Sequence, residues 1–174
     1  MELLRPEVDA VLELLLGGRP IDQLAFVVED LPSIVKNWSR IRGGEWMVYT
    51  YNPDNIPELE YHGRRGTFSM RLAMHGGAPQ LEFIQAIDGP SIYLDWIKER
   101  GHGFHHIGYF MPSLNDAVES LAAVGMQPIM TGEGYGAEGD GGFAYFDFVD
   151  TLGVVIEFIE VPTIRRPSES LLAS

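Results

Sequence analysis

Four polar residues interrupt segments that are otherwise strongly apolar, and their types could do chemistry together. Glu82 lies inside the run Leu81-Glu82-Phe83-Ile84, and Glu157 lies inside the apolar run 154–159. Gln23 and His106 begin two further apolar runs, 23–28 and 106–111. One amide oxygen, one imidazole nitrogen and two carboxylates form a mixed, fairly hard donor set. Such a set suits Zn, Ni, Co, Mn or Fe with water in open positions.

The two carboxylates need compensation if their strands are buried. Side chains alternate along a strand, so Glu157 shares its face with Val155 and Ile159. An unpaired buried charge costs several kcal/mol even after the surroundings relax (on the order of 3–5 kcal/mol). Arg71 could pair with one carboxylate. Alternatively, a divalent cation could lie between all four polar side chains.

An internal repeat places the four residues at equivalent positions. The segment 23–28 aligns with 106–111 at an offset of 83 residues, and 81–84 aligns with 156–159 at an offset of 75. Each first segment leads into a helix signal, with Asp30 as the candidate cap in one half and Ser113 in the other. A single Glu or His in a strand is usually an ordinary side chain, so it is the duplication that sets these four residues apart.

The elements around these residues predict two similar halves, each reading β-α-β-β-β. The remaining strand candidates are 45–51 and 67–74 in the first half, and 127–130 and 143–148 in the second. We expect an α+β fold in which two βαβββ modules form a curved mixed sheet around a central trough. The expected division is a helical N-terminal extension (1–18), the first module (19–90), a linker helix (91–103), the second module (104–162) and a C-terminal tail (163–174).

Composition excludes several classes of function. The net charge of −13 argues against nucleic acid, because phosphate binding needs clustered Lys and Arg. The absence of Cys excludes disulfides, iron–sulfur clusters and thiol nucleophiles. No apolar stretch approaches the length of a membrane span, and the chain starts without the basic segment of a secretory signal. A cytoplasmic protein with a small-molecule substrate is therefore the expectation.

The segment Gly101-His102-Gly103-Phe104-His105-His106-Ile107-Gly108-Tyr109 resembles the linker and fifth strand of epimerase-like members of the vicinal oxygen chelate superfamily. That superfamily includes glyoxalase I, methylmalonyl-CoA epimerase, extradiol dioxygenases and fosfomycin-resistance proteins. The resemblance covers about residues 19–162. It implies one metal held on the first and last strand of each module, and commonly a homodimer. Carried over by position, the implied ligands are Gln23, Glu82, His106 and Glu157.

One position departs from part of the family. Epimerases and dioxygenases usually have His where this chain has Gln23, whereas a Gln, Glu, His, Glu set is similar to eukaryotic-type glyoxalase I. The resemblance therefore implies metal-assisted proton transfer next to a carbonyl, by an isomerase, epimerase or lyase acting on a small hydrophobic substrate. It makes Glu157 the expected base, with Glu82 opposite it as ligand or second proton carrier. The alternatives are an extradiol-type dioxygenase and a non-catalytic binding protein.

Several surrounding segments carry weaker expectations. The Gly-rich stretch 132–142 is interpreted as a flexible connection at the opening of the trough, suited to a lid. In a regular strand, His105 points to the face opposite His106. Residues 165–174 are expected to be a loose end or a dimer contact. Four arginines could bind an anionic part of the substrate: Arg40, Arg42, Arg64 and Arg65.

Overall fold

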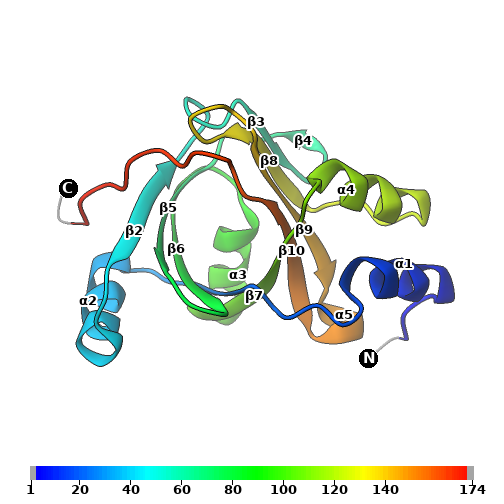
Figure 1. Ribbon diagram of the computed structural model, residues 1–174, viewed down its shortest axis with the longest axis horizontal. Helices are drawn as coiled ribbons and strands as arrows, with labels where there is room; N and C mark the ends of the chain where they lie inside the picture. Colours follow the sequence, from blue (N-terminus) through cyan, green and yellow to red (C-terminus); the bar gives the residue numbers. More distant parts are fainter. Residues whose placement is uncertain (1–2, 172–174) are drawn as a thin grey trace.

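The computed structural model describes residues 3–171 and contains a single ten-stranded mixed sheet. Its strand order is β2-β5-β6-β1-β7-β10-β9-β8-β3-β4. The sheet curls around a central trough, with helices on its outside and α3 at its inner side (Figure 1). This arrangement confirms the predicted α+β fold. Positions 1–2 and 172–174, the outer ends of the expected extension and tail, lie outside the described residues.

The helices are α1 (Pro6–Leu16), α2 (Leu31–Arg42), α3 (Ile92–Arg100), α4 (Leu114–Ala123) and α5 (Val149–Leu152). The strands are β1 (Gln23–Val27), β2 (Trp46–Tyr51), β3 (Glu58–Tyr61), β4 (Arg64–Arg65), β5 (Ser69–His75), β6 (Gln80–Asp88), β7 (Gly103–Phe110), β8 (Met130–Tyr135), β9 (Gly141–Phe148) and β10 (Val154–Glu160).

Two four-stranded halves meet at the centre of the sheet. The first half is β2-β5-β6-β1 and the second is β7-β10-β9-β8. Within each half the first strand pairs in parallel with the last, as β1 with β6 and β7 with β10. The halves are joined where β1 pairs antiparallel with β7. The strands that begin and end each repeat therefore lie together at the centre of the sheet.

Local sequence signals fix the helix ends where they were expected. The Asp30 side chain accepts a hydrogen bond from Ser33 N at 3.0 Å, and Ser113 Oγ accepts one from Asp116 N at 3.2 Å. Both satisfy amide groups that have no partner inside the helix. Helix α2 ends at Arg42 and is followed by Gly43, whose φ of 64° suits a residue without a side chain. The two helices thus begin at corresponding points of the repeat.

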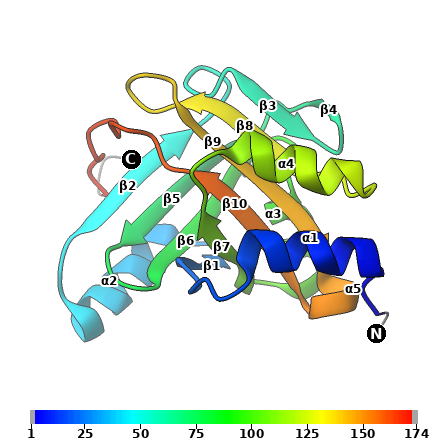
Figure 2. The ribbon, with the colours of Figure 1, turned by 45° about the vertical axis from the view of Figure 1, so that its right-hand side comes forward.

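Side chains alternate along the strands, so one hydrophobic cluster lies on the inner face of the sheet and two lie on its outer face. On β10, Val155 belongs to the inner cluster, whereas Ile156 and Phe158 pack outward. Helices α1 and α4 lie side by side over that outer face (Figure 2). Helix α2 covers the corresponding outer face of the first half, next to Phe83. The inner face is left to line the trough. No helix among residues 3–171 has the length and apolar character needed to cross a membrane.

The Gly-rich stretch corrects one expectation. The strand expected at 127–130 instead begins at Met130 and runs to Tyr135, so this stretch is largely sheet with a short connection between β8 and β9. Gly132 is needed there because a Cβ atom would lie 2.4 Å from Phe143 Cζ. Close packing of an aromatic ring against the strand, and not flexibility, explains this glycine.

A hairpin formed by β3 and β4 was not predicted. It belongs to the first half in sequence, yet β3 pairs with β8 of the second half, where Glu58 lies opposite Glu133. Its strands are short, and Glu58 and Glu60 are exposed, so the segment has little apolar alternation to reveal it. The hairpin extends the second half of the sheet at its edge.

The C-terminal tail is also attached. Residues 163–170, here called the C-terminal strap, cross from β10 over the opening of the trough towards β2 (Figure 1). Val48 N donates to Ser168 Oγ at 2.9 Å, and Glu169 N donates to Val48 O at 2.8 Å. The expectation of a loose end is therefore wrong for the strap.

Candidate metal centre

Strand register places the four polar residues at equivalent points of the two halves. Glu82 lies two residues beyond the β6 partner of Gln23. Glu157 likewise lies two residues beyond the β10 partner of His106. Because β1 and β7 are neighbours, all four positions fall on adjacent strands at the centre of the sheet. The duplicated register explains why residues far apart in sequence meet.

Three of the side chains form one compact buried group. His106 Nε2 lies 2.9 Å from Glu157 Oε2 and 3.7 Å from Glu82 Oε2. One ligand atom from each of the three lies within 4.8 Å of those of the other two. The exposed fraction is 0% for His106 and 5% for each glutamate. Such spacing between donor atoms is compatible with a shared cation.

Gln23 directs an unused oxygen towards the same space. Its Nε2 donates to Gln80 Oε1 at 2.9 Å, and its Oε1 is buried without a hydrogen-bond partner among the described residues. Among the described residues, His106 Nε2 is likewise buried without a hydrogen bond, although Glu157 Oε2 lies 2.9 Å away. Buried polar atoms are rarely left unpaired. The two orphaned atoms and the two carboxylates match the donor set of a divalent cation.

Small residues leave room for the group. Ala25 pairs with both Glu82 and His106 across the sheet, and Gly108 pairs with both Gln23 and Glu157. A Cβ atom on Gly108 would lie 2.9 Å from Gln23 Oε1. The repeat therefore also places a small residue at the equivalent position of each half, beside the larger polar ones.

His105 corrects a second expectation. The pairing of β1 with β7 shifts register between Ala25 and Phe26, which leaves His105 as an extra residue on β7. The two imidazoles accordingly meet, with His105 Nδ1 at 2.8 Å from His106 Nδ1. His105 is buried and packs against Tyr93 and Trp96 of α3. The regular alternation that would place it on the opposite face is broken by this bulge.

Burial decides the protonation of the group in the absence of a cation. Desolvation raises the pKa of Glu157 to about 8, against a smaller opposing effect of the Tyr145 hydroxyl. Desolvation and the nearby Glu157 raise the pKa of Glu82. Desolvation lowers the pKa of His106 to about 3, so its ring is neutral near pH 7. A neutral imidazole has the lone pair that a cation requires.

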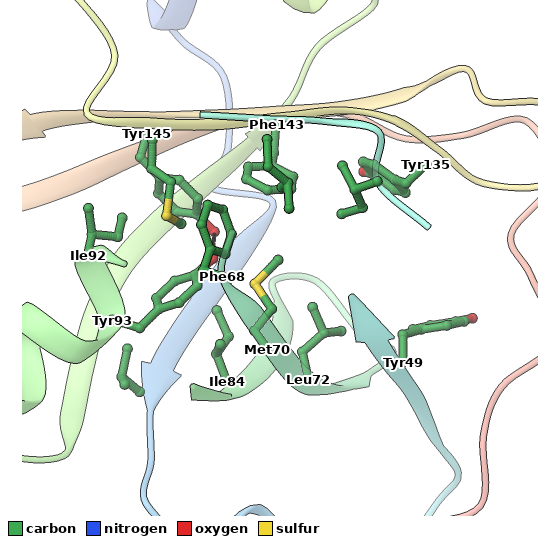
Figure 3. Close-up of a cluster of buried hydrophobic side chains, with 14 of the residues drawn as sticks. Tyr49, Phe68, Met70, Leu72, Ile84, Ile92, Tyr93, Tyr135, Phe143 and Tyr145 are labelled. Carbon is green, nitrogen blue, oxygen red and sulfur yellow. Dashed lines mark hydrogen bonds between the residues drawn. The ribbon is translucent and has the colours of Figure 1, made fainter. Parts of the chain in front are cut away.

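The group faces a small cavity of about 30 Å³ with aromatic and thioether walls. Tyr93, Phe143, Tyr145 and Met70 gather around it on the inside of the trough (Figure 3). The hydroxyls of Tyr93 and Tyr145 are hydrogen-bonded at 2.8 Å. The sequence had not singled out Tyr93, whose position on a linker helix carries no signal of its role.

The arginines are distributed differently from expectation. Arg71 does not compensate a buried glutamate: it faces away from the trough, donates to Ser170 O at 2.7 Å and lies 3.8 Å from Glu169 Oε2. Arg40, Arg42, Arg64 and Arg65 are exposed. Among the described residues, the one arginine lining the cavity is Arg165 of the C-terminal strap, which sequence reasoning missed.

Solved structures with the same fold come from several bacteria. A variant methylmalonyl-CoA epimerase from Streptomyces coelicolor, in complex with 2-nitronate-propionyl-CoA, has a TM-score of 0.59 and 18% identity, covering 83% of this chain and 98% of that one. The epimerase from Mycobacterium tuberculosis has a TM-score of 0.53 and 19% identity, covering 89% and 92%. Hypothetical protein BH1468 from Bacillus halodurans has a TM-score of 0.54 and 17% identity, covering 86% and 97%.

These likenesses concern the fold, because the identities are low. No curated protein matches the chain at a significant level. The sequence profile described as Glyoxalase/Bleomycin resistance protein/Dioxygenase superfamily matches residues 22–146, which include Gln23, Glu82 and His106. On this match, and with the duplicated half-sheets described above, the chain belongs to the Glyoxalase/Bleomycin resistance protein/Dioxygenase superfamily.

Proposed function

We propose that this protein is a divalent-metal-dependent enzyme that moves a proton on a carbon next to a carbonyl group. The observation that carries the proposal is the buried cluster of Glu82, His106 and Glu157, with Gln23 Oε1 unpaired beside it. Burying two carboxylates without a positive partner costs free energy, on the order of 3–5 kcal/mol for an unpaired charge. Because no described lysine or arginine forms an ion pair with either glutamate, a cation is the compensation that the donor set favours.

Each donor has a defined part in holding the ion. His106 would contribute Nε2, Gln23 would contribute Oε1, and the two glutamates would contribute one oxygen each. The mixed N and O set is compatible with Zn, Ni, Co, Mn or Fe. A bound ion would act as a Lewis acid on substrate oxygens and thereby acidify the neighbouring C–H bond.

The chain's own residues would then handle the proton. Glu157 is the proposed base, because it is buried beside the cavity, where a bound cation would keep it ionised and little water competes for the proton. Glu82, on β6 of the other half, would return the proton from the opposite side. The aromatic walls of the cavity exclude water and suit a small apolar group on the substrate.

The donor set favours proton transfer over oxygen activation. Dioxygenases with non-haem iron use two histidines and one carboxylate. Among the described residues, the cluster contains one imidazole and two carboxylates. Epimerases among the solved structures of this fold, one of them in complex with methylmalonyl-CoA, support the same preference for an isomerase, epimerase or lyase.

Two measurements test the proposal. Protein purified without chelator should contain about one divalent ion per chain by elemental analysis. The metal-loaded protein should then catalyse incorporation of deuterium from D₂O, followed by NMR, into a panel of thioesters, hemithioacetals and cyclic ketones.

Glu157→Gln should abolish deuterium incorporation while preserving the circular dichroism spectrum, whereas Glu119→Gln on the exposed face of α4 should have no effect. Incorporation that persists in Glu157→Gln would refute the base assignment. Protein without stoichiometric metal would favour the non-catalytic binding protein, and ferrous iron with oxygen uptake would favour the dioxygenase.

A further inference from the structure

The C-terminal strap holds an arginine at the opening of the trough. On the N-terminal side of this arginine, Arg165, the strap is joined to the turn between β8 and β9. Thr163 N donates to Asp140 Oδ2 at 2.9 Å, and Ala137 N donates to Ile164 O at 2.9 Å. After it, Ser168 and Glu169 bind β2. The two attachments come from opposite halves of the sheet, and Arg165 lies between them.

Arg165 lies on the boundary between two cavities. It lines the inner cavity of about 30 Å³ together with Glu82 and Glu157. It also lines an outer groove of about 270 Å³ beneath the strap. Tyr51 and Tyr135 line both cavities as well, and the Arg165 guanidinium carbon lies 6.0 Å from the centre of the Tyr49 ring. A ligand that entered the inner cavity from the groove would pass this arginine.

The positive charge of Arg165 is only partly used within the protein. Across residues 3–171, no carboxylate lies within ion-pair distance of its guanidinium, and the side chain is half-buried. Its charge does reach the site, because it lowers the pKa of Glu82 against the larger effect of burial. The guanidinium group of arginine has its donors in a planar fork that matches the two oxygens of a carboxylate. The charge of a half-buried arginine is also screened by salt less than the charge of an arginine on the surface.

The charges of the proposed centre leave this arginine in excess. Two ionised glutamates balance a divalent cation, and Arg165 then gives the loaded site a net charge of +1. The outer groove adds Arg166 and Glu169, whose opposite charges cancel, and the other walls near Arg165 carry tyrosines. A site with this balance favours an anion over a neutral molecule of the same shape.

We propose that Arg165 is the anion-recognition residue of the site, and that the substrate carries a carboxylate group close to the carbon that loses its proton. This inference rests on the proposed function and adds its substrate class. The reacting end of the substrate, which has few atoms, fills the inner cavity. Its carboxylate binds Arg165 at the boundary, and the rest of the molecule occupies the outer groove. The strap is the part of the fold that makes the site selective for charge.

Two hydroxamates test the inference, because both chelate a divalent ion through the same pair of oxygens. Acetohydroxamate ends in a methyl group, whereas malonic acid monohydroxamate carries a carboxylate at the corresponding end. Their dissociation constants are measured by titration calorimetry on the Zn-loaded protein. The variants are Arg165→Gln and Arg165→Lys, and the control is Arg64→Gln, at an exposed position of β4 that lines neither cavity.

The wild-type protein should bind the carboxylate-bearing hydroxamate about ten-fold more tightly than acetohydroxamate, as expected for a charge-assisted contact. Arg165→Gln should remove this preference and leave the affinity for acetohydroxamate unchanged. Arg165→Lys should retain part of the preference, and Arg64→Gln should retain all of it. Melting temperatures identify any variant that fails to fold.

A preference that survives in Arg165→Gln, or an equal loss of affinity for both hydroxamates, would assign Arg165 a purely structural role beside Glu82 and overturn the inference. Failure of the wild-type protein to bind Zn would overturn the proposed function itself. The two failures are therefore distinguishable in one set of samples.

Discussion

His105 Nδ1 and His106 Nδ1 lie 2.8 Å apart, although the residues are neighbours on one strand. One nitrogen must donate and the other must accept. His106 Nε2 can offer its lone pair to a cation only if His106 Nδ1 carries the ring proton. In that tautomer His106 Nδ1 donates the hydrogen bond and His105 Nδ1 accepts it. The bulge in β7 therefore allows one histidine to set the tautomer of the next.

His105→Phe should weaken metal binding. Phenylalanine retains the packing against Tyr93 and Trp96 but removes the hydrogen-bond acceptor. Loss of such an outer contact lowers metal affinity about 10- to 100-fold. Competition with a chromophoric zinc chelator measures the effect. His102→Phe, at a largely exposed position, is the control and should bind as the wild type does. Equal affinities in all three proteins would argue against the tautomer assignment.

Gly108→Ala should displace Gln23. The added methyl group would lie 2.9 Å from Gln23 Oε1 and 3.0 Å from Ile159 Cδ1. Overpacking of this kind destabilises a protein by about 1–3 kcal/mol, and the moved amide would no longer face the cluster. We expect weaker zinc binding in the chelator assay and a lower midpoint in urea. Gly76→Ala, where a Cβ atom meets nothing within 4 Å, is the matched control.

Metal affinity should increase with pH. Burial raises the pKa of Glu157 to about 8, so near pH 6 an incoming cation must displace a proton from this carboxyl group. The neutral His106 adds no such competition, because its pKa is lowered to about 3. Zinc titrations at several pH values should therefore show affinity rising towards about pH 8. In Glu157→Gln the slope should be smaller, and an unchanged slope would place the proton on another group.

The stability of the metal-free protein should decrease as the pH rises, in contrast to the metal affinity. A carboxyl group whose pKa rises from 4.5 unfolded to about 8 folded favours folding in its protonated form. Its contribution is fully present below about pH 4.5 and is lost as the pH rises towards 8. Urea unfolding of chelator-treated protein should reveal a decline over this range that is smaller in Glu157→Gln, where Glu82 still has a raised pKa. Added zinc should stabilise most at the alkaline end.

Glu169→Ala should loosen the C-terminal strap. The Glu169 carboxylate accepts hydrogen bonds from Thr50 N at 2.7 Å and from Thr50 Oγ1 at 2.8 Å. These contacts are exposed, so the free energy of unfolding should fall by less than about 1 kcal/mol. Trypsin cleavage after Arg165 should nevertheless become faster, as followed by mass spectrometry. Glu138→Ala, in the exposed connection between β8 and β9, should be cleaved at the wild-type rate.

The amino-acid sequence by itself determined the duplicated pattern and the four polar positions at its centre. Alternation along 154–159 marked the inner face of β10, and Asp30 and Ser113 marked the starts of two helices. These features depend on neighbours within a few residues, and the same local pattern occurs twice. Their chemistry could therefore be proposed before any contact was known.

The tertiary structure decided the parts that depend on distant segments. The bulge that turns His105 towards His106 arises from pairing with β1, and the β3–β4 hairpin is held by β8. Arg165 reaches the cavity only because the strap is fixed at both ends by the opposite halves of the sheet. Long-range pairing of this kind leaves no periodicity in the local sequence, which is why alternation placed His105 on the wrong face and composition left the strap as a loose tail.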